Sequence, residues 1–322
     1  MNEKLTKPIS RSQFWKSVRS PILRSLDEDK RLHNLAKGFW VYDELIADLR
    51  NAGWIRFGPG FKAGVYGHPK SPYCIKILGM GVGENPLYFC ERGYYIEHER
   101  NMLVDFWESG FRFAPTVLNR QDSISFLRKC GVRPFQAENR VQRNDVMVME
   151  YIPGIPLAIQ TGRHLDYDVY LDAFDTGVLD EMHTALETLR IQLQRANNSG
   201  VFHNDPMPPN IIFTMRKADK IEAKLVDFEM AQNSKKSNPT HVNSTVETLY
   251  RERGVPVNQS TLAPMSNLDI YLIDQSIDLV KRIRAASVRP DDSLLDAISI
   301  GVSFIGGFSI NLGRAIRSLK GG

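Results

Sequence analysis

Residues 201–213 read VFHNDPMPPNIIF, and this stretch is the most informative of the chain. Asp205 and Asn210 lie in a loop that two prolines stiffen, between two apolar segments. An Asp can orient a hydroxyl group and accept its proton, and an Asn side-chain oxygen is a hard ligand suited to Mg²⁺. Phosphoryl transfer needs both roles, together with a second metal carboxylate, a cation on the phosphates and a backbone cradle above them.

Candidates for the remaining roles flank this loop. Downstream, the apolar segment AKLVDFE supplies Asp227 as a second metal carboxylate. Upstream, Lys76 lies in the apolar strand-like segment YCIKIL, and a strand lysine without a local acid usually pairs elsewhere. Glu99, in the helical pattern EHERNML, is the preferred partner for this lysine, and Glu97 is the alternative.

A glycine-containing segment precedes the lysine strand. Its sequence FGPGFKAGVY would let backbone N–H groups approach phosphate oxygens closely, although the same glycines also suit an ordinary hairpin turn. Taken alone, Asp205 and Asn210 would likewise suit a capped turn. Together with Lys76, Glu99 and Asp227, both segments favour phosphate and metal binding over ordinary turns. The residues expected to form the backbone cradle are Gly58, Gly60, Ala63 and Val65.

Periodicity in the chain indicates an α+β protein. Residues 35–53 follow a helical pattern that ends at Gly53, and residues 54–78 are glycine-punctuated and β-rich. A helix closing at Gly110 follows, then a second strand-like group ending in DVMVMEYIPG, then helical patterns. This order predicts a small β-rich lobe followed by a larger, mainly helical lobe.

These motifs resemble those of the protein-kinase-like superfamily. The catalytic loop H-R-D-x-x-x-x-N appears as His203-Asn204-Asp205 with Asn210, and D-F-G appears as Asp227-Phe228-Glu229. The strand lysine appears in CIK, and Ala63 stands for the third glycine of G-x-G-x-x-G-x-V. VMVMEYIPGIPL is similar to the adenine-binding linker, which places base contacts on the backbone near Glu150 and Tyr151.

The resemblance implies a bilobal fold that binds ATP and Mg²⁺. Lys76, fixed by Glu99, would hold the α- and β-phosphates, Asn210 and Asp227 would bind the metal, and Asp205 would act on the acceptor hydroxyl. His203 is interpreted as a hydrogen-bonding residue of the loop rather than a base. The expected divisions are a basic helical extension (1–50), an N-lobe (51–150), a C-lobe (151–290) and a glycine-rich apolar tail (291–322).

Departures from the family pattern indicate an atypical kinase. Asn204 replaces the Arg that receives an activation-loop phosphate in many protein kinases, and Met207 replaces a Lys near the transferred phosphate. Glu229 and the absent A-P-E motif are similar to aminoglycoside-phosphotransferase-like and choline-kinase-like enzymes, whereas GFKAGVY resembles RIO-type kinases. The acceptor is therefore a protein Ser/Thr hydroxyl or that of a small molecule or glycolipid. A catalytically inactive, nucleotide-binding pseudokinase is the alternative, and nucleotidyl transfer also stays open.

Composition restricts the partners. The 322 residues carry a net charge of only +4, which does not by itself indicate nucleic-acid binding. Three scattered cysteines without a CxxC pattern, and no secretion signal, lead us to expect a cytoplasmic protein without a transmembrane segment. In the tail, residues 297–313 alternate around Gly306-Gly307, which predicts a hairpin. Peripheral membrane contact is the alternative for this tail.

Overall fold

A computed structural model describes the parts of the chain that carry most of the motifs. Gly58 and Gly60 of the expected cradle lie outside the described residues, as do most of the basic extension and most of the tail. The described residues are 44–57, 63–78, 86–161, 164–166, 176–215, 220–238, 242, 246–247, 264–288, 304–305 and 308–311.

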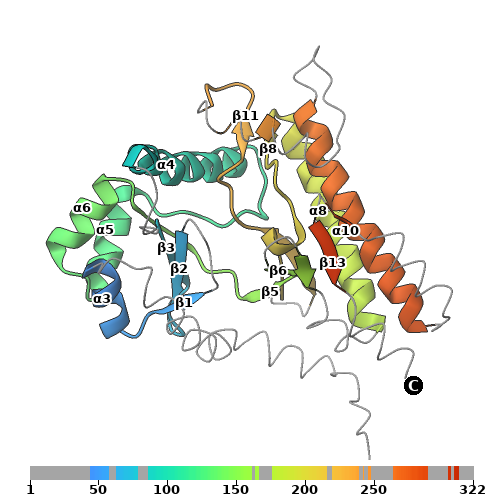
Figure 1. Cartoon of the computed structure of the whole chain (residues 1–322), viewed down its shortest axis with the longest axis horizontal. Coiled ribbons are helices and arrows are strands. Elements are labelled where there is room, and N and C mark those ends of the chain that lie inside the picture. The colour runs from blue at the N-terminus through green and yellow to red at the C-terminus, as the bar shows by residue number, and fades with distance from the viewer. Residues whose placement is uncertain are drawn as a thin grey trace, which may run out of the picture. The chain divides into compact units, whose positions relative to one another are not determined.

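The chain divides into two compact units. The N-unit holds the described residues of 44–108 and 114–152, and the C-unit holds those of 109–113 and from 153 onward. The second stretch of the N-unit ends at Ile152. Helices accompany mostly antiparallel sheets in the structure, which confirms the α+β class (Figure 1).

An antiparallel sheet in the order β1-β2-β3-β4 forms the centre of the N-unit. Its register aligns Val65 with Lys76, and Lys76 with Met147. The first three strands come from the segment expected to be β-rich, and the fourth strand comes from the segment before the linker. The strands are β1 (Ile55–Phe57), β2 (Ala63–Gly67), β3 (Tyr73–Leu78) and β4 (Val146–Glu150).

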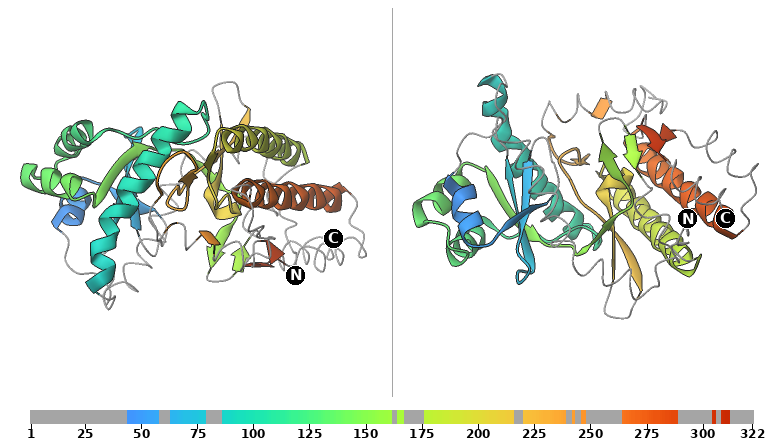
Figure 2. Two further views of the ribbon diagram at one scale, coloured as in Figure 1. Left: turned by 90° about the horizontal axis from the view of Figure 1, so that it is seen from above. Right: turned by 60° about the horizontal axis from the view of Figure 1, so that its bottom comes forward.

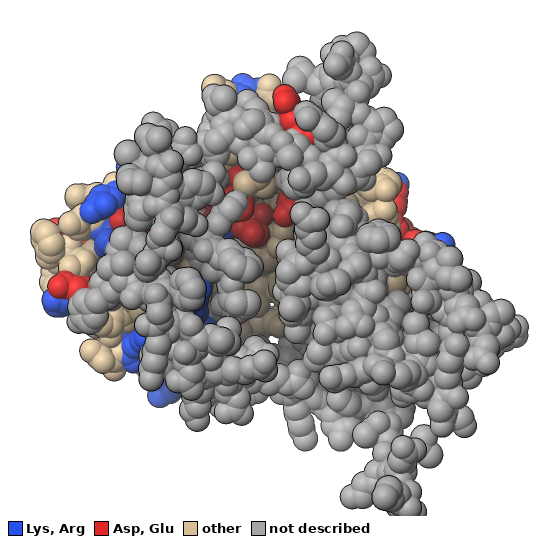
Figure 3. Space-filling model, viewed as in Figure 1, with Lys and Arg blue, Asp and Glu red and all other residues tan. Residues whose placement is uncertain are grey.

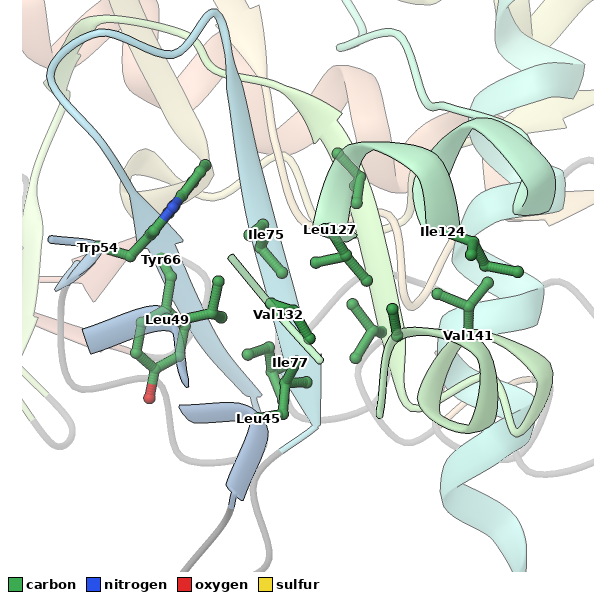
Figure 4. Packing of buried hydrophobic residues seen from close by; sticks show 13 residues of the cluster. Leu45, Leu49, Trp54, Tyr66, Ile75, Ile77, Ile124, Leu127, Val132 and Val141 are labelled. Carbon is green, nitrogen blue, oxygen red and sulfur yellow. The ribbon is translucent and has the colours of Figure 1, made fainter. Parts of the chain in front are cut away.

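Three helices cover one face of this sheet. Ile75 and Ile77 of β3 share a buried cluster with Val146 and Val148 of β4 and with apolar residues of the three helices (Figure 4). Because successive strand residues alternate between faces, Lys76 belongs to the opposite face, where it meets helix α4 (Pro86–Glu108). The covering helices are α3 (Glu44–Asn51), α5 (Arg120–Lys129) and α6 (Pro134–Gln142).

Helices α5 and α6 correct the sequence prediction, which placed a group of strands between α4 and the linker. The strand character there is limited to β4 and an isolated bridge between Val117 and Met149. Both helices have local start signals: Asn119 accepts a hydrogen bond from Asp122 N–H, and Pro134 occupies the first turn of α6. The helices are short and mostly polar, so their apolar periodicity is weak.

Two long helices dominate the C-unit. α8 (Thr176–Asn198) and α10 (Pro264–Val288) lie side by side (Figures 1 and 2). Ion pairs of Arg190 with Asp274 and of Lys281 with Glu187 indicate that the helices run antiparallel. The loop region beside them contains β5 (Gly154–Pro156), β8 (Val201–Phe202), the 3₁₀ turn η1 (Pro208–Asn210), β9 (Ile211–Met215), β10 (Ile221–Leu225) and β11 (Gln232–Asn233).

Part of the tail joins a sheet of the C-unit. β12 (Phe304–Ile305) and β13 (Phe308–Asn311) pair antiparallel, as the hairpin prediction required. β13 also pairs parallel with β7 (His164–Asp166), which pairs with β6 (Ile159–Thr161). The sheet order is β12-β13-β7-β6.

Charged side chains of both signs are mixed on the described surface of the N-unit (Figure 3). Arg133 contacts Glu44 at 2.8 Å and Asp48 at 3.0 Å, and Arg128 pairs with Glu138.

Within the described residues, none of the helices combines the length and apolar composition that a membrane span requires.

Candidate functional site

The N-unit contains a buried ion pair between the predicted lysine and glutamate. Lys76 Nζ lies 3.0 Å from Glu99 Oε1 and 2.7 Å from Oε2, and only 2% of the Glu99 side chain is exposed. Glu97 contacts Arg120 at 2.7 Å and Asn144 at 3.2 Å instead. The structure therefore selects Glu99 over Glu97 as the partner of Lys76.

The strand before Lys76 brings part of the predicted cradle to the same face. Val65 of β2 is paired directly with Lys76 of β3, and directly opposed residues of an antiparallel pair share a face. The backbone of Ala63 is paired with that of Leu78, two residues beyond Lys76. Val65 therefore lies beside the lysine on the same face of the sheet.

The last residue of β4 and the first residue of the linker have their N–H groups engaged within the N-unit. Glu150 N–H donates to the Thr116 carbonyl at 2.7 Å, and Tyr151 N–H donates to the Pro72 carbonyl at 2.8 Å. Ile152, by contrast, makes no hydrogen bond among the residues that the structure describes. A base that needs a backbone donor would find it at Ile152, one residue beyond those that sequence reasoning named.

In the C-unit, Asp205 and Asn210 are joined directly. Asn210 Nδ2 donates to the Asp205 carbonyl oxygen at 2.9 Å and to its carboxylate Oδ2 at 3.0 Å. A tight turn connects the two residues, because Met207 N–H donates to the Asp205 carbonyl and Asn210 N–H donates to the Met207 carbonyl. The amide orientation leaves Asn210 Oδ1 without a hydrogen bond from the described residues. This oxygen is therefore a candidate metal ligand.

Asp227 lies beside this turn in a strained backbone conformation. The N–H of Val226 donates to the Asn210 carbonyl at 3.0 Å, which aligns the end of β10 with the loop. Asp227 has φ of +66°, a left-handed value that is uncommon for residues other than glycine. Such strain persists only where the surrounding structure fixes it, and it occurs often at functional sites.

His203 has a structural environment. It is fully buried, its ring packs edge-on against Phe228 at 4.5 Å between centroids, and Nδ1 accepts the Asp205 N–H at 3.2 Å. Burial lowers the pKa of His203 to about 4, although the Asp227 charge and the Val226 backbone oppose this shift. A neutral, buried imidazole supports the interpretation of His203 as a loop-stabilising residue.

Sequence reasoning missed Asp269, which anchors the loop from α10. Its Oδ2 accepts the His203 N–H at 2.9 Å, and its Oδ1 accepts the Asn204 N–H at 2.6 Å. Asp269 is fully buried, and burial raises its pKa to about 7 although these hydrogen bonds favour the charged form. The available signal was an acid between Leu268 and Leu272 on an apolar helix face.

The oxygen donors fit a Mg²⁺ ion that is held partly by nucleotide phosphates. Asn210 Oδ1 and the Asp227 carboxylate are hard ligands, and Mg²⁺ in phosphoryl-transfer sites commonly takes few protein ligands. The described residues contain no group of three or more His, Cys, Asp or Glu that could hold a metal ion by themselves.

Comparison of the chain with models of protein families gave no match, and a search of curated proteins gave none either.

Proposed function

We propose that this protein is an ATP-dependent phosphotransferase with a bilobal, protein-kinase-like fold. The N-unit would be the N-lobe, contributing Lys76 and the strand positions around it. The C-unit would be the C-lobe, contributing Asp205, Asn210 and Asp227. Support comes from the Lys76–Glu99 ion pair, whose atoms lie 2.7 Å apart and whose acid is the partner that the sequence pattern favours over Glu97.

The observation that carries the proposal is the hydrogen-bonded unit of Asp205 and Asn210. One amide nitrogen binds both the carbonyl and the carboxylate of Asp205, so the carboxylate is aimed by the same residue that presents a metal-ligand oxygen. A loop that merely capped a turn would not need this pairing. It would not need a fully buried carboxylate beneath it either, and Asp269 supplies one.

Each residue would have a defined chemical role. Asp205 would orient the acceptor hydroxyl and take its proton, which is typically worth about 10²–10⁴-fold in rate. Lys76 would neutralise phosphate charge, with Glu99 holding the ammonium in place. Mg²⁺, when bound through Asn210 and Asp227, would offset negative charge on the phosphate oxygens. The backbone N–H of Ile152 would orient the base.

The environment of Met207 bears on the acceptor. Its side chain is only 4% exposed, so this position adds to the core and supplies no cation near a transferred phosphate. Many protein kinases have a Lys near the transferred phosphate where this chain has Met207. The buried Met207 therefore favours an acceptor that does not need this Lys, such as the hydroxyl of a small molecule or glycolipid. A protein Ser/Thr acceptor is the second candidate.

Transfer from [γ-³²P]ATP with Mg²⁺ tests the proposal. Wild type, Asp205→Ala and the control Asp274→Asn, which alters an exposed ion pair on α10, would be compared with and without a protein acceptor. We expect turnover in wild type and control and its loss in Asp205→Ala. Label on protein would indicate a protein acceptor, and release of free phosphate alone would indicate a missing small-molecule acceptor. ATP binding without turnover in wild type would contradict the proposal and favour a nucleotide-binding module.

A further inference from the structure

Asn204, between His203 and Asp205, is fully buried and hydrogen-bonded through both its backbone and its side chain. Its N–H donates to Asp269 Oδ1 at 2.6 Å, which fixes the residue to helix α10. Its φ of +65° is left-handed, a conformation that Asn tolerates better than most residues. The backbone at this position is therefore held in place, and the direction of the side chain is set with it.

The side-chain amide of Asn204 reaches the segment that follows Asp227. Nδ2 donates to the Met230 carbonyl at 2.9 Å and to Gln232 Oε1 at 3.0 Å. Because a backbone carbonyl can only accept, the amide nitrogen must be the atom that faces Met230. Both amide hydrogens then have acceptors, and Gln232 is itself fully buried in β11, paired with Phe202 of β8.

Asn204 thereby holds the far end of the turn that follows Asp227. The near end is held where Val226 N–H meets the Asn210 carbonyl, and Ala231 N–H closes the turn on the Phe228 carbonyl at 3.1 Å. Asp227 and Asn204 are two of the three described residues other than glycine with positive φ. The Asn204 amide thus bonds the chain three residues beyond Asp227.

We propose that Asn204 is a positioning residue that sets Asp227 relative to Asp205, and that this arrangement needs no covalent modification of the chain. The inference rests on the proposed function. A neutral amide whose two hydrogens are both used offers no cationic partner to a phosphate. An Arg that binds a phosphate would connect the two segments only while the phosphate is present. The Asn204 amide connects them without a phosphate, so Asp227 is held in position in the unmodified protein.

Two substitutions separate the amide from the backbone conformation. Asn204→Gly keeps the left-handed φ and removes both side-chain hydrogen bonds. Asn204→Asp keeps the shape but turns an acceptor oxygen toward the Met230 carbonyl, and it serves as the second variant if the glycine variant fails to fold. Gln232→Ala, which removes one of the two acceptors, is expected to show the same effects more weakly.

The measurements are steady-state kinetics with varied Mg²⁺ and amide hydrogen exchange of residues 203–205 and 227–233. In Asn204→Gly we expect kcat to fall about 10- to 100-fold, the size of effect that a small misplacement of a reacting group causes. Half-saturation by Mg²⁺ should rise about tenfold, while the KM for ATP changes little, because Lys76 and the linker are untouched. Exchange should accelerate in both segments together. Phosphatase treatment of the wild type should leave its rate unchanged.

Two results would overturn this inference but not the proposed function. One is an active Asn204→Gly variant whose Mg²⁺ dependence and amide hydrogen exchange equal those of the wild type. The other is a wild type that phosphatase inactivates. A wild type that neither binds ATP nor transfers phosphate would overturn the proposed function. Hydrogen exchange does not depend on activity, so in that case it still reports whether Asn204 joins the two segments, and a lack of response would reject the connection itself.

Discussion

At the scale of single residues, the buried Lys76–Glu99 pair should be far more sensitive than its neighbour. Glu99→Gln removes the negative charge beside an ammonium that is only 10% exposed, and breaking such a buried pair typically costs about 3–5 kcal/mol. Glu97→Gln is the matched control on the same helix, because its contact with Arg120 is half-exposed and worth about 0–1 kcal/mol. Urea unfolding should separate the two variants, and the KM for ATP should rise only in Glu99→Gln. Equal losses of stability in the two variants would show that the Lys76–Glu99 pair is not buried.

His203 and Asp269 should give the loop opposing pH dependences. Burial lowers the pKa of His203 from 6.5 to about 4 and raises that of Asp269 from 3.8 to about 7. Between pH 4 and 6.5 the unfolded chain therefore holds a proton on the histidine, and the folded protein holds one on the aspartate. The two contributions to the free energy of unfolding cancel in the wild type.

Substitution should expose each contribution. In Asp269→Asn only the histidine contribution remains, so the free energy of unfolding should fall as the pH drops from 6.5 to 4. In His203→Gln only the aspartate contribution remains, so the free energy of unfolding should fall as the pH rises from 4 to 7. Each slope can reach about 1.4 kcal/mol per pH unit. Denaturant titrations at pH 5, 6 and 7 measure both, and parallel curves for the two variants would contradict the assignment.

At the scale of elements, two glycines should respond differently to the same substitution. A Cβ on Gly154 in β5 would lie 2.3 Å from the Phe213 carbonyl oxygen of β9, so Gly154→Ala should disrupt this strand pair. A Cβ on Gly110 meets no atom within 4 Å, and its φ of +84° leaves only backbone strain, about 1–2 kcal/mol. Thermal unfolding should therefore show a clearly larger loss for Gly154→Ala. A reversed order would mean that β5 does not pair with β9 as described.

The elements also show where sequence reasoning succeeds. The strands around Lys76 and the loop from Asp205 to Asn210 could be predicted because their chemistry is local: apolar alternation, glycine turns and fixed motif spacing. Asp269 and Ile152 could not, since their significance depends on contacts with residues distant in sequence or on which N–H groups are already used. Helices α5 and α6 were missed because an amphipathic helix of ten or fewer residues, nearly all polar on one side, resembles loop and strand segments.

The tail gives a further prediction at this scale. Ending the chain at residue 303 removes β12 and β13 and leaves β7 paired only with β6. An unpaired strand edge exposes backbone donors and acceptors, so residues 159–166 should exchange their amide hydrogens faster and the protein should aggregate more readily. Exchange of α8, which lies outside this sheet, is the internal control. Unchanged exchange in 159–166, together with lost binding to lipid vesicles, would favour the membrane alternative for the tail.

At the scale of the whole molecule, the two units are not separable by a single cut. The C-unit includes residues 109–113, which precede the last helices of the N-unit in sequence. Phe111 is only 2% exposed, Phe113 packs edge-on against it, and the Phe113 carbonyl accepts the Leu225 N–H at 3.1 Å. A fragment that begins at residue 153 loses the hydrogen bond from β10, the strand that leads into Asp227, to the Phe113 carbonyl.

The fragment 153–322 should therefore fail to fold alone, although the chain divides after Ile152. Removing a buried Phe side chain such as that of Phe111 typically costs about 3–5 kcal/mol, and the half-buried Phe113 adds a smaller loss, against a domain stability of about 5–15 kcal/mol. Co-expression with fragment 1–152 supplies residues 109–113 and should restore a soluble complex, whereas 1–152 carrying Phe111→Ala and Phe113→Ala should restore it poorly. Circular dichroism and co-purification measure both outcomes. A folded 153–322 fragment on its own would show that the 109–113 segment is dispensable for the C-unit.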